Sequence, residues 1–399
     1  MKITYLHQYF CKPSMTGGIR SYEFAKRLAN SGHDITVITS DSENSFSGWK
    51  VEKLDGFEVH WVSVKYDNSY GFLKRLYAFI KFLVLASVHI CSLKSDKLYV
   101  TSTPLTVAIP ALIYKLFKRK PYVFEVRDVW PEVPIALGVV KSKILIKVAF
   151  LLEKLAYKNA EHIVALSPDM ENSVLERCGN TPVTVITNAA DCHLFNLSLP
   201  NNDVFLRKLN NIKKNHKKVV FYTGAFGLVN NLRSFIKLSS FSNNDIGFVI
   251  IGQGKEETEL KEFAKALSVL DNTLYFLPSV NKNQLSFVHR TFDMATSTVL
   301  PINALYANSA NKVFDAFAAG TPLLINHGGW IKELIERTKC GLVINNDPTV
   351  NDYYALRDFL FSEDRYSEAC RASLTLGQHE YNREVLFKKL LSVINAEVK

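Results

Sequence analysis

Strand-like and helical segments alternate along most of this 399-residue chain. Residues 3–6, 35–39 and 98–101 form short apolar runs typical of buried strands, whereas residues 20–31 and 106–117 carry apolar side chains at helical spacing. Such alternation is typical of parallel sheets that helices cover on both faces. The pattern therefore predicts an α/β protein.

The alternation occurs twice, and a polar stretch rich in Asn and Lys separates the two series. The length of the chain also favours two or three domains. We predict a first domain at residues 1–196, a linker at 197–217 and a second domain at 218–375, with a last helical segment, 376–399, that crosses back to the first domain. Two such Rossmann-like domains would face each other across a cleft at the carboxyl ends of their strands, where ligands bind in open α/β sheets.

The composition is that of a folded protein, with 47% hydrophobic and 22% charged residues. The six cysteines are scattered, which indicates neither a disulfide framework nor a zinc site and favours the cytosol. Asp41 and Glu43 lack a further acidic residue nearby, so we expect no bound metal there. We also expect no cofactor. Residues 1–6 match a short strand better than a signal peptide.

The net charge of +10 predicts an acidic partner, either nucleic acid or an anionic membrane surface. The sequence contains no recognisable nucleic-acid-binding motif. Residues 142–158 instead form a basic amphipathic pattern, in which Lys143, Lys147 and Lys154 share one side of the helix and aliphatic residues cover another. This pattern favours an anionic membrane surface over nucleic acid.

Residues 72–93 form a more hydrophobic helical segment, with Lys74, Arg75 and Lys81 clustered on one side. The segment is nearly long enough to span a bilayer, but its charges interrupt it. An interfacial helix is therefore the better interpretation. The alternative for both basic helices is that they pack on a sheet and present their lysines to water.

Residues 311–325 place a polar cluster at the start of a short predicted helix, ahead of a buried strand. Asn311, Lys312 and Asp315 lie within about one turn of the helix N-terminus, where backbone N–H groups favour an anion. The lysine adds a full positive charge. The segment therefore predicts a site for a phosphate-bearing ligand, and the alternative is a capped surface helix.

Glycine-rich turns follow strands in both predicted domains. Gly17 and Gly18 follow the first strand of the chain, and Gly224 follows the first strand of the second domain. Paired glycines allow backbone N–H groups to approach a ligand closely. The first turn lacks the GxGxxG spacing, which argues against a dinucleotide cofactor. A simple tight turn is the alternative interpretation.

Residues 124–132 place three carboxylates and an arginine beside a tryptophan at the end of a predicted strand. Asp128 could hold a hydroxyl group or stabilise developing positive charge, and Arg127 could pair with a phosphate or orient that carboxylate. We therefore predict chemistry at these two residues. The alternative is a structural ion pair between them.

Taken together, these motifs resemble the retaining GT-B glycosyltransferases of family 4. The matching segments are TGGIRSYEFAKRLANSGHDITVIT, EVRDVWPE, ITNAADCHLF, YTGAFG, VIIGQGKEETELKEFA and NKVFDAFAAGTPLLI. They cover the chain nearly end to end, and their order is more specific than any single segment. Within EVRDVWPE, the Arg-Asp and Trp-Pro-Glu residues are similar to those of a bacterial subgroup that builds O-antigen and capsule, including N-acetylfucosamine transferases.

The resemblance implies transfer of a sugar from a nucleotide diphosphate donor, with retention of configuration and without a metal. Gly17, Gly18, the Gly224 turn and Lys312 would then hold the diphosphate leaving group. Asp315 stands where the family has a glutamate that usually contacts the ribose.

Two positions depart from the family pattern. Ala307 occupies the position where a first glutamate is common, and residues 229–231 replace an Arg/Lys pair that often follows the glycine turn. Neutralisation of the diphosphate would therefore shift to Lys312 and Arg127.

Together these observations predict a cytoplasmic glycosyltransferase that is peripheral on the inner face of the cell membrane. It would move a sugar, such as an N-acetylated deoxyhexosamine, from a UDP-sugar to a polyprenyl-diphosphate-linked saccharide. Asp128 would orient the acceptor or stabilise the oxocarbenium-like centre. The alternatives are a UDP-sugar 2-epimerase, although the chain lacks the His-Val-Glu-Ala-Gly type of segment expected of one, and a non-catalytic membrane protein that binds a nucleotide sugar.

Overall fold

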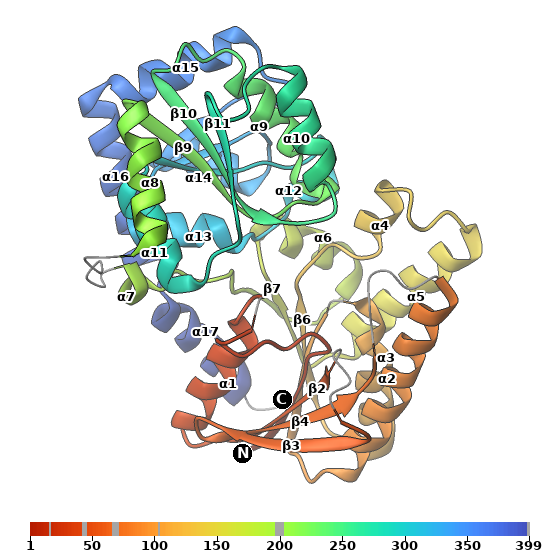
Figure 1. Ribbon diagram of the computed structural model, residues 1–399. Helices are drawn as coiled ribbons and strands as arrows, with labels where there is room; N and C mark the ends of the chain where they lie inside the picture. Colours follow the sequence, from red (N-terminus) through yellow and green to blue (C-terminus); the bar gives the residue numbers. More distant parts are fainter. Residues whose placement is uncertain (16, 42–45, 66–71, 103, 196–202, 397–399) are drawn as a thin grey trace. The chain divides into compact units, whose positions relative to one another are not determined.

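The computed structural model describes residues 1–15, 17–41, 46–65, 72–102, 104–195 and 203–396, without the side chains of residues 72, 73, 75 and 76. The chain forms two compact units (Figure 1). The N-terminal unit comprises Met1–Thr187 and Phe387–Lys399, and the C-terminal unit comprises Asn188–Leu386. Each unit is a Rossmann-like α/β domain, which confirms the predicted fold class.

The N-terminal unit is built on a sheet of eight described strands, in the order β3-β4-β2-β1-β5-β6-β7-β8. All neighbouring strands are parallel except the antiparallel pair β3 and β4. The strands are β1 (Lys2–Leu6), β2 (Asp34–Asp41), β3 (Trp49–Leu54), β4 (Phe57–Ser63), β5 (Lys97–Thr101), β6 (Tyr122–Val126), β7 (His162–Ala165) and β8 (Val183–Val185). Because β1, β5 and β6 are neighbours, the residues that follow them meet at one edge of the sheet.

Helices of the N-terminal unit pack on this sheet through side chains such as Phe24 and Tyr114, which are fully buried. Helix α2 contacts α3, and α3 contacts α5 (Figure 1). The helices are α1 (Arg20–Asn30), α2 (Phe72–Ser92), η1 (Leu105–Val107), α3 (Ala108–Lys118), α4 (Glu132–Ala136), α5 (Lys143–Asn159) and α6 (Pro168–Cys178). The Ser142 hydroxyl caps α5 by accepting from the Leu145 N–H, as the start of a helix there requires.

The C-terminal unit has a fully parallel sheet of six described strands, in the order β11-β10-β9-β12-β13-β14. These strands are β9 (Lys218–Ala225), β10 (Ile246–Gln253), β11 (Leu274–Leu277), β12 (Met294–Ser297), β13 (Leu323–Ile325) and β14 (Gly341–Val343). Strands β10 and β13 are buried along nearly their whole length, and β9 is buried from Val219 to Tyr222, which explains their continuous apolar runs.

The helices of the C-terminal unit cover both faces of its sheet (Figure 1). They are α7 (Cys192–Phe195), α8 (Val204–Asn215), η2 (Leu228–Asn230), α9 (Leu232–Ser239), α10 (Glu257–Ala266), α11 (Lys282–Thr291), α12 (Asn303–Tyr306), α13 (Asn311–Ala319), α14 (Trp330–Thr338), α15 (Val350–Phe361) and α16 (Glu363–Gln378). Helix α17 (Arg383–Asn395) starts in this unit and ends in the N-terminal unit, where the Lys97 ammonium donates to the Ile394 carbonyl at 2.9 Å.

The division of the chain differs from the predicted linker at residues 197–217. The change of unit falls between Thr187 and Asn188, and most of the predicted linker forms helix α8. Asp203 caps this helix, and Phe205, Leu209 and Ile212 are its buried stripe. The Asn and Lys residues that suggested a linker lie between these apolar positions. Residues 197–202 of the predicted linker lie outside the described residues.

Candidate functional site

The segment that follows residue 310 forms helix α13, as its sequence predicts. Asn311 is the first residue of the helix, and the N-cap residue Ala310 makes no side-chain capping hydrogen bond. Phe314 and Phe317 are fully buried, and Gly320 ends the helix with a φ of 66°, in the left-handed region that glycine adopts readily. The alternative of a side-chain-capped surface helix therefore does not describe this helix.

Lys312, the second residue of α13, lies in an aromatic and amide environment. Its ammonium group is 4.0 Å from the centre of the Tyr222 ring and donates to the Asn230 side-chain carbonyl at 3.3 Å. No carboxylate of the described residues lies within 4.0 Å of it, and burial lowers the pKa of Lys312 to about 7. An anion bound here would compensate the desolvated charge.

The Gly224 turn lies next to this lysine. Gly224 has a φ of 145°, and a Cβ atom on it would come within 3.0 Å of the Tyr222 hydroxyl and 3.4 Å of the Lys312 ammonium nitrogen. Any larger residue would crowd the space around the ammonium group. The structure therefore brings together Gly224 and Lys312, two of the residues that the sequence predicted as donor-binding. Tyr222 and Asn230 complete this group and were not predicted, because their side chains have no distinctive spacing.

Asp315 lies one turn further along α13 and has a different partner. Its buried carboxylate accepts from the ammonium group of Lys282, on α11, at 2.7 Å. The predicted ribose contact of Asp315 would therefore have to coexist with this ion pair. The two residues are 33 positions apart, and no sequence pattern connects them.

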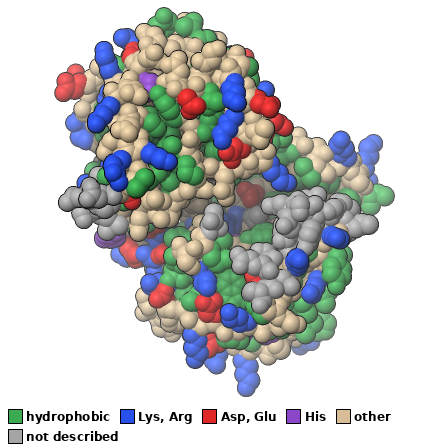
Figure 2. Space-filling model, in the orientation of Figure 1, with side chains coloured by type: hydrophobic (Ala, Val, Ile, Leu, Met, Phe, Trp, Pro, Cys, Tyr) green, Lys and Arg blue, Asp and Glu red, His purple; other side chains and the backbone are tan. Residues whose placement is uncertain are grey.

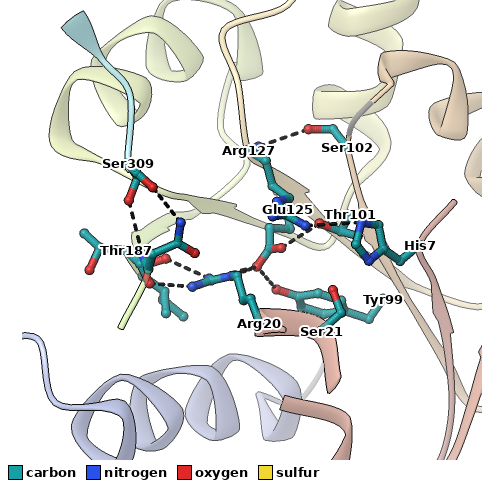
Figure 3. Close-up of polar contacts among 12 residues, drawn as sticks. His7, Arg20, Ser21, Tyr99, Thr101, Ser102, Glu125, Arg127, Thr187 and Ser309 are labelled. Carbon is teal, nitrogen blue, oxygen red and sulfur yellow. Dashed lines mark hydrogen bonds and ion pairs between the residues drawn. The ribbon is translucent and has the colours of Figure 1, made fainter. Parts of the chain in front are cut away.

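In the N-terminal unit, Glu125 of β6 is fully buried and accepts four hydrogen bonds (Figure 3). The donors are the Arg20 Nε and Nη2 atoms at 3.0 and 2.8 Å, and the Tyr99 and Thr101 hydroxyls, both at 2.6 Å. Burial alone would raise the pKa of Glu125, but the Arg20 charge and these donors lower it below its usual value. Glu125 is thus a structural carboxylate and not the reactive one.

Arg20 also binds the backbone of the two residues that precede the change of unit. Its Nη2 donates to the Ile186 carbonyl at 2.8 Å, and its Nη1 donates to the Thr187 carbonyl (Figure 3). The guanidinium group therefore ties helix α1 to the last residues before the change of unit. These contacts satisfy a buried arginine, which needs several acceptors.

Glu132, another carboxylate of the predicted reactive segment, pairs with Arg177 of α6. Arg177 in turn donates to Glu153 of α5 at 3.2 Å. Glu125 and Glu132 are both held in ion pairs, and Asp128 is the carboxylate of the segment whose side chain is exposed to solvent. The geometry therefore keeps Asp128 as the candidate for chemistry among the three.

Arg127 lies at the carboxyl edge of the sheet, where β1, β5 and β6 end. Its backbone N–H donates to the Ser102 hydroxyl at 3.0 Å, and its guanidinium group lies 3.2 Å from the His7 Nε2 atom (Figure 3). Burial and the Arg127 charge hold the pKa of His7 well below its usual value, so the imidazole is neutral and accepts from the arginine. His7 and Ser102 were not predicted from the sequence.

Gly17 and Gly18 lie just before helix α1, in the same unit. Gly17 has a φ of 146°, and a Cβ atom on it would approach the Cys11 sulfur to 2.6 Å. Close packing against Cys11 is therefore one reason for glycine at this turn. Thr16, which precedes it, lies outside the described residues.

The basic helices of the N-terminal unit expose apolar side chains as well as lysines. On α5, Lys143, Lys147 and Lys154 are exposed, and so are most of the aliphatic side chains of the predicted amphipathic helix. The exposed apolar residues are Tyr77, Ile80, Val84 and Val88 on α2, Ile109, Leu116 and Phe117 on α3, and Ile144, Leu145, Val148, Leu151 and Leu155 on α5. We call this set the apolar helical face. Figure 2 shows hydrophobic side chains beside basic ones on the N-terminal unit.

The exposure of this face contradicts the alternative in which α5 packs its aliphatic residues on the sheet and presents only its lysines to water. Ile144 is 74% exposed and Val148 is 55% exposed. Lys74 of α2 is exposed and Lys81 is partly exposed, while the side chain of Arg75 lies outside the described residues. No helix in the described part of the chain has both the length and the hydropathy needed to cross a bilayer.

The described residues include no group of three or more His, Cys, Asp or Glu side chains arranged to hold a metal ion. Residues 42–45, which include Glu43 of the Asp41 and Glu43 pair, lie outside the described residues.

Comparison with known proteins identifies the class of this protein. Residues 17–194 match the family described as Glycosyltransferase Family 4, and residues 206–372 match Glycosyl transferases group 1. Together the two matches span most of the chain, and the protein is a glycosyltransferase of the two-domain GT-B class. No curated protein has a significantly similar sequence.

Solved structures of glycosyltransferases share the fold over the whole chain. Sucrose-phosphate synthase from Thermosynechococcus elongatus has a TM-score of 0.77 at 12% identity, with 98% of each chain covered. Anabaena HepE in complex with UDP and glucose has a TM-score of 0.71 at 16% identity and 99% coverage of each chain. WaaG, a glycosyltransferase involved in lipopolysaccharide biosynthesis, has a TM-score of 0.71 at 16% identity and covers 99% of this chain and 100% of its own. At these identities, the likeness establishes the fold.

Proposed function

We propose that this glycosyltransferase uses a UDP-sugar as donor, retains the anomeric configuration, needs no metal and extends a polyprenyl-diphosphate-linked saccharide. The observation that carries the proposal is the environment of Lys312, a partly buried cation without a carboxylate partner among the described residues. The finer assignment, to an N-acetylated deoxyhexosamine donor and to O-antigen or capsule assembly, rests on the resemblance of the sequence.

The diphosphate of a UDP-sugar fits the Lys312 environment chemically. Two negatively charged phosphates would supply the anionic partner that Lys312 lacks among the described residues. The N–H groups at the start of α13 would add hydrogen bonds. The structurally similar protein HepE has structures in complex with UDP and glucose and with UDP-glucose, which supports a donor of this class. The lysine and the helix N-terminus would then stabilise the leaving group, a role that a metal ion has in other enzymes.

In the proposed reaction, the bond between the anomeric carbon and the β-phosphate oxygen breaks, and UDP leaves with the electron pair. The acceptor hydroxyl attacks the same face of the sugar, and its proton passes to the departing β-phosphate oxygen of UDP, so the configuration is retained. Lys312 would stabilise the negative charge that develops on the diphosphate. Asp128, the exposed carboxylate of its segment, would orient the acceptor hydroxyl or stabilise the oxocarbenium-like centre.

The apolar helical face supports a lipid-linked acceptor. Aliphatic side chains exposed beside lysines are typical of helices that lie in a membrane interface. Each lysine near an anionic leaflet contributes about 1 kcal/mol, which together with apolar burial is enough for reversible attachment. An acceptor on a polyprenyl diphosphate would be presented at such a surface, on the inner face of the cell membrane.

The proposed activity is tested by mixing purified protein with membranes that carry a lipid-linked N-acetylhexosamine and a panel of UDP-sugars, in buffer with EDTA. Release of UDP only in the presence of both substrates, with a product heavier by one sugar, is the expected result. NMR of the product would report the anomeric configuration. A new UDP-sugar formed without acceptor would instead identify the epimerase, and UDP binding without turnover would identify the non-catalytic protein.

The membrane surface is tested separately by flotation with vesicles that contain anionic lipid. Val148→Glu on α5 should reduce the bound fraction severalfold, because it places a charge in the apolar helical face. Val204→Glu is the matched control, since Val204 is an exposed valine of the C-terminal unit. Equal binding of both variants would contradict the assignment of this face to the membrane.

A further inference from the structure

A buried histidine in the C-terminal unit has a ring nitrogen without a hydrogen-bond partner. His327 follows strand β13, its side chain is only 4% exposed, and its Nε2 atom has no partner among the described residues. Buried polar atoms in native proteins are almost always paired, so each exception calls for an explanation. A ligand atom is one such explanation.

The hydrogen bond of the other ring nitrogen fixes the tautomer of His327. The Nδ1 atom lies 2.7 Å from the Gly328 carbonyl oxygen, which can only accept, so Nδ1 carries the proton. Burial and the charge of Lys312 keep the pKa of His327 below its usual value despite this hydrogen bond. In a neutral ring protonated on Nδ1, the Nε2 atom is a hydrogen-bond acceptor.

Packing holds the His327 ring in place. It stacks on Tyr306 of α12, with the ring centres 5.7 Å apart and an interplanar angle of 24°. A Cβ atom on Gly328 would come within 3.4 Å of the same tyrosine ring, so the turn after β13 lies close against α12. The acceptor is therefore preorganised, as a recognition group needs to be.

A second buried acceptor lies on the segment between α12 and α13. The Asn308 side-chain N–H donates to the Leu305 carbonyl at 2.7 Å, which orients the amide, and the side-chain oxygen is buried without a partner. The Asn308 backbone carbonyl accepts from Trp330 Nε1 at 2.9 Å, which holds this segment on α14. Both orphan atoms, His327 Nε2 and Asn308 Oδ1, are therefore acceptors that would suit a ligand with O–H or N–H groups.

We propose that His327 Nε2 accepts a hydrogen bond from a hydroxyl or amide N–H of the donor's sugar ring, with Asn308 Oδ1 as a second acceptor. The assignment rests on the proposed function of Lys312 as the cation for the donor diphosphate. The transferred sugar is bonded directly to that diphosphate. His327 follows β13, which is separated from β9 only by β12 in a parallel sheet, so His327 and the Gly224 turn beside Lys312 lie at the same carboxyl edge. Ala307, the buried residue that ends α12, has no polar side-chain group that could do the same.

Calorimetry with the full-length protein tests the proposal, with UDP, UDP-glucose and UDP-N-acetylglucosamine as probes. His327→Phe keeps a flat ring for Tyr306 and removes the acceptor. The variant should leave the Kd for UDP within about twofold of the wild-type value. It should raise the Kd for the UDP-sugar that wild type prefers by about ten- to a hundredfold, as expected when one buried hydrogen bond is lost. His327→Gln, whose amide oxygen can reach the position of Nε2, should restore part of the affinity.

Several outcomes would overturn the proposal. Equal losses for UDP and the UDP-sugar would assign His327 to the diphosphate, and no loss for either would mean that the Nε2 atom pairs only with a buried water. If thermal unfolding shows that His327→Phe is not folded, the affinities of His327→Gln and Asn308→Leu for UDP and the UDP-sugar are compared with those of wild type instead. Failure of wild type to bind any UDP-sugar while it binds UDP would instead overturn the proposed function, so the two failures are distinguishable.

Discussion

Arg20 in the N-terminal unit and Lys312 in the C-terminal unit are both cations enclosed by protein, but only Arg20 has a carboxylate partner among the described residues. Glu125 and two backbone carbonyls satisfy the Arg20 guanidinium group. Lys312 has only the face of Tyr222 and one amide oxygen. Burial alone lowers both pKa values, but the Glu125 charge raises that of Arg20 above its usual value, whereas that of Lys312 falls to about 7.

The difference separates a structural charge from one that is kept for a ligand. Desolvation of an ion costs free energy, and a folded chain offsets the cost with a partner of opposite charge. A site that must bind an anion cannot supply that partner itself, and so its cation stays incompletely satisfied. Perturbed pKa values cluster at functional sites for this reason.

Removal of one member of the Arg20 and Glu125 pair should have the largest effect. Glu125→Gln or Arg20→Met should lower the free energy of unfolding of the N-terminal unit by about 3–5 kcal/mol, because each leaves an uncompensated buried group. Native-state hydrogen exchange at the β6 amides would measure the loss. Lys237→Met is the matched control, since its ion pair with Asp347 is exposed and should contribute little. A loss as large in the control would contradict the structural assignment.

The carboxylates of residues 125–132 are next in expected effect. Asp128→Asn should reduce the transfer rate by about a hundred- to a thousandfold, the size expected when one electrostatic contact to the transition state is lost. Glu132→Gln should reduce it less than tenfold, because Glu132 is held by Arg177. Steady-state assays at saturating UDP-sugar would compare the two. A larger effect of Glu132→Gln would reverse the proposed roles.

The affinity for a UDP-sugar should depend on pH through Lys312. Its protonated form binds the diphosphate, and its pKa is about 7 in the unliganded protein. Affinity should therefore be highest below pH 7 and fall by up to about tenfold per pH unit above it, until the pKa of the complex is reached. Calorimetry from pH 6 to 8.5 would show this fall.

Lys312→Arg serves as the control for the pH dependence, because an arginine stays charged over the whole range. A UDP-sugar is the suitable probe, since its diphosphate is esterified at both ends and keeps a constant charge. A flat profile for wild type, or an equal fall in Lys312→Arg, would show that another group titrates.

The smallest expected effect concerns Asp315 and its partner Lys282. If Asp315 holds a ribose hydroxyl besides the lysine, Asp315→Asn should weaken UDP binding by about three- to tenfold. The same variant should discriminate less than wild type between UDP and its 2′-deoxy and 3′-deoxy analogues. Unchanged discrimination would mean that Asp315 serves only the ion pair with Lys282.

Much of the architecture could be predicted from the sequence, because both sheets are buried and their strands read as apolar runs between amphipathic helices. Helix α8 was missed because its three buried side chains lie among Asn and Lys residues. Periodicity predicted the aliphatic face of α5 but left packing on the sheet open as the alternative, since periodicity does not reveal whether a face has a partner. Contacts with neighbouring elements decide that.

The candidate site was only partly predictable, since its local motifs have sequence patterns and their partners do not. Lys312 and Gly224 stand in recognisable segments, and the structure brings them together. Glu125 is separated from Arg20 by 105 positions. Only the fold could show that Glu125 is paired and that Asp128 of the same segment is exposed.

Calorimetric titration of Lys312→Met with UDP tests the central claim most directly. The variant should bind UDP about ten- to a hundredfold more weakly than wild type, as expected for the loss of one charge-assisted contact. Its thermal stability should be unchanged or higher, because a desolvated charge has been removed. Wild-type affinity for UDP in a folded Lys312→Met protein, or a stability loss like that of Arg20→Met, would contradict the account.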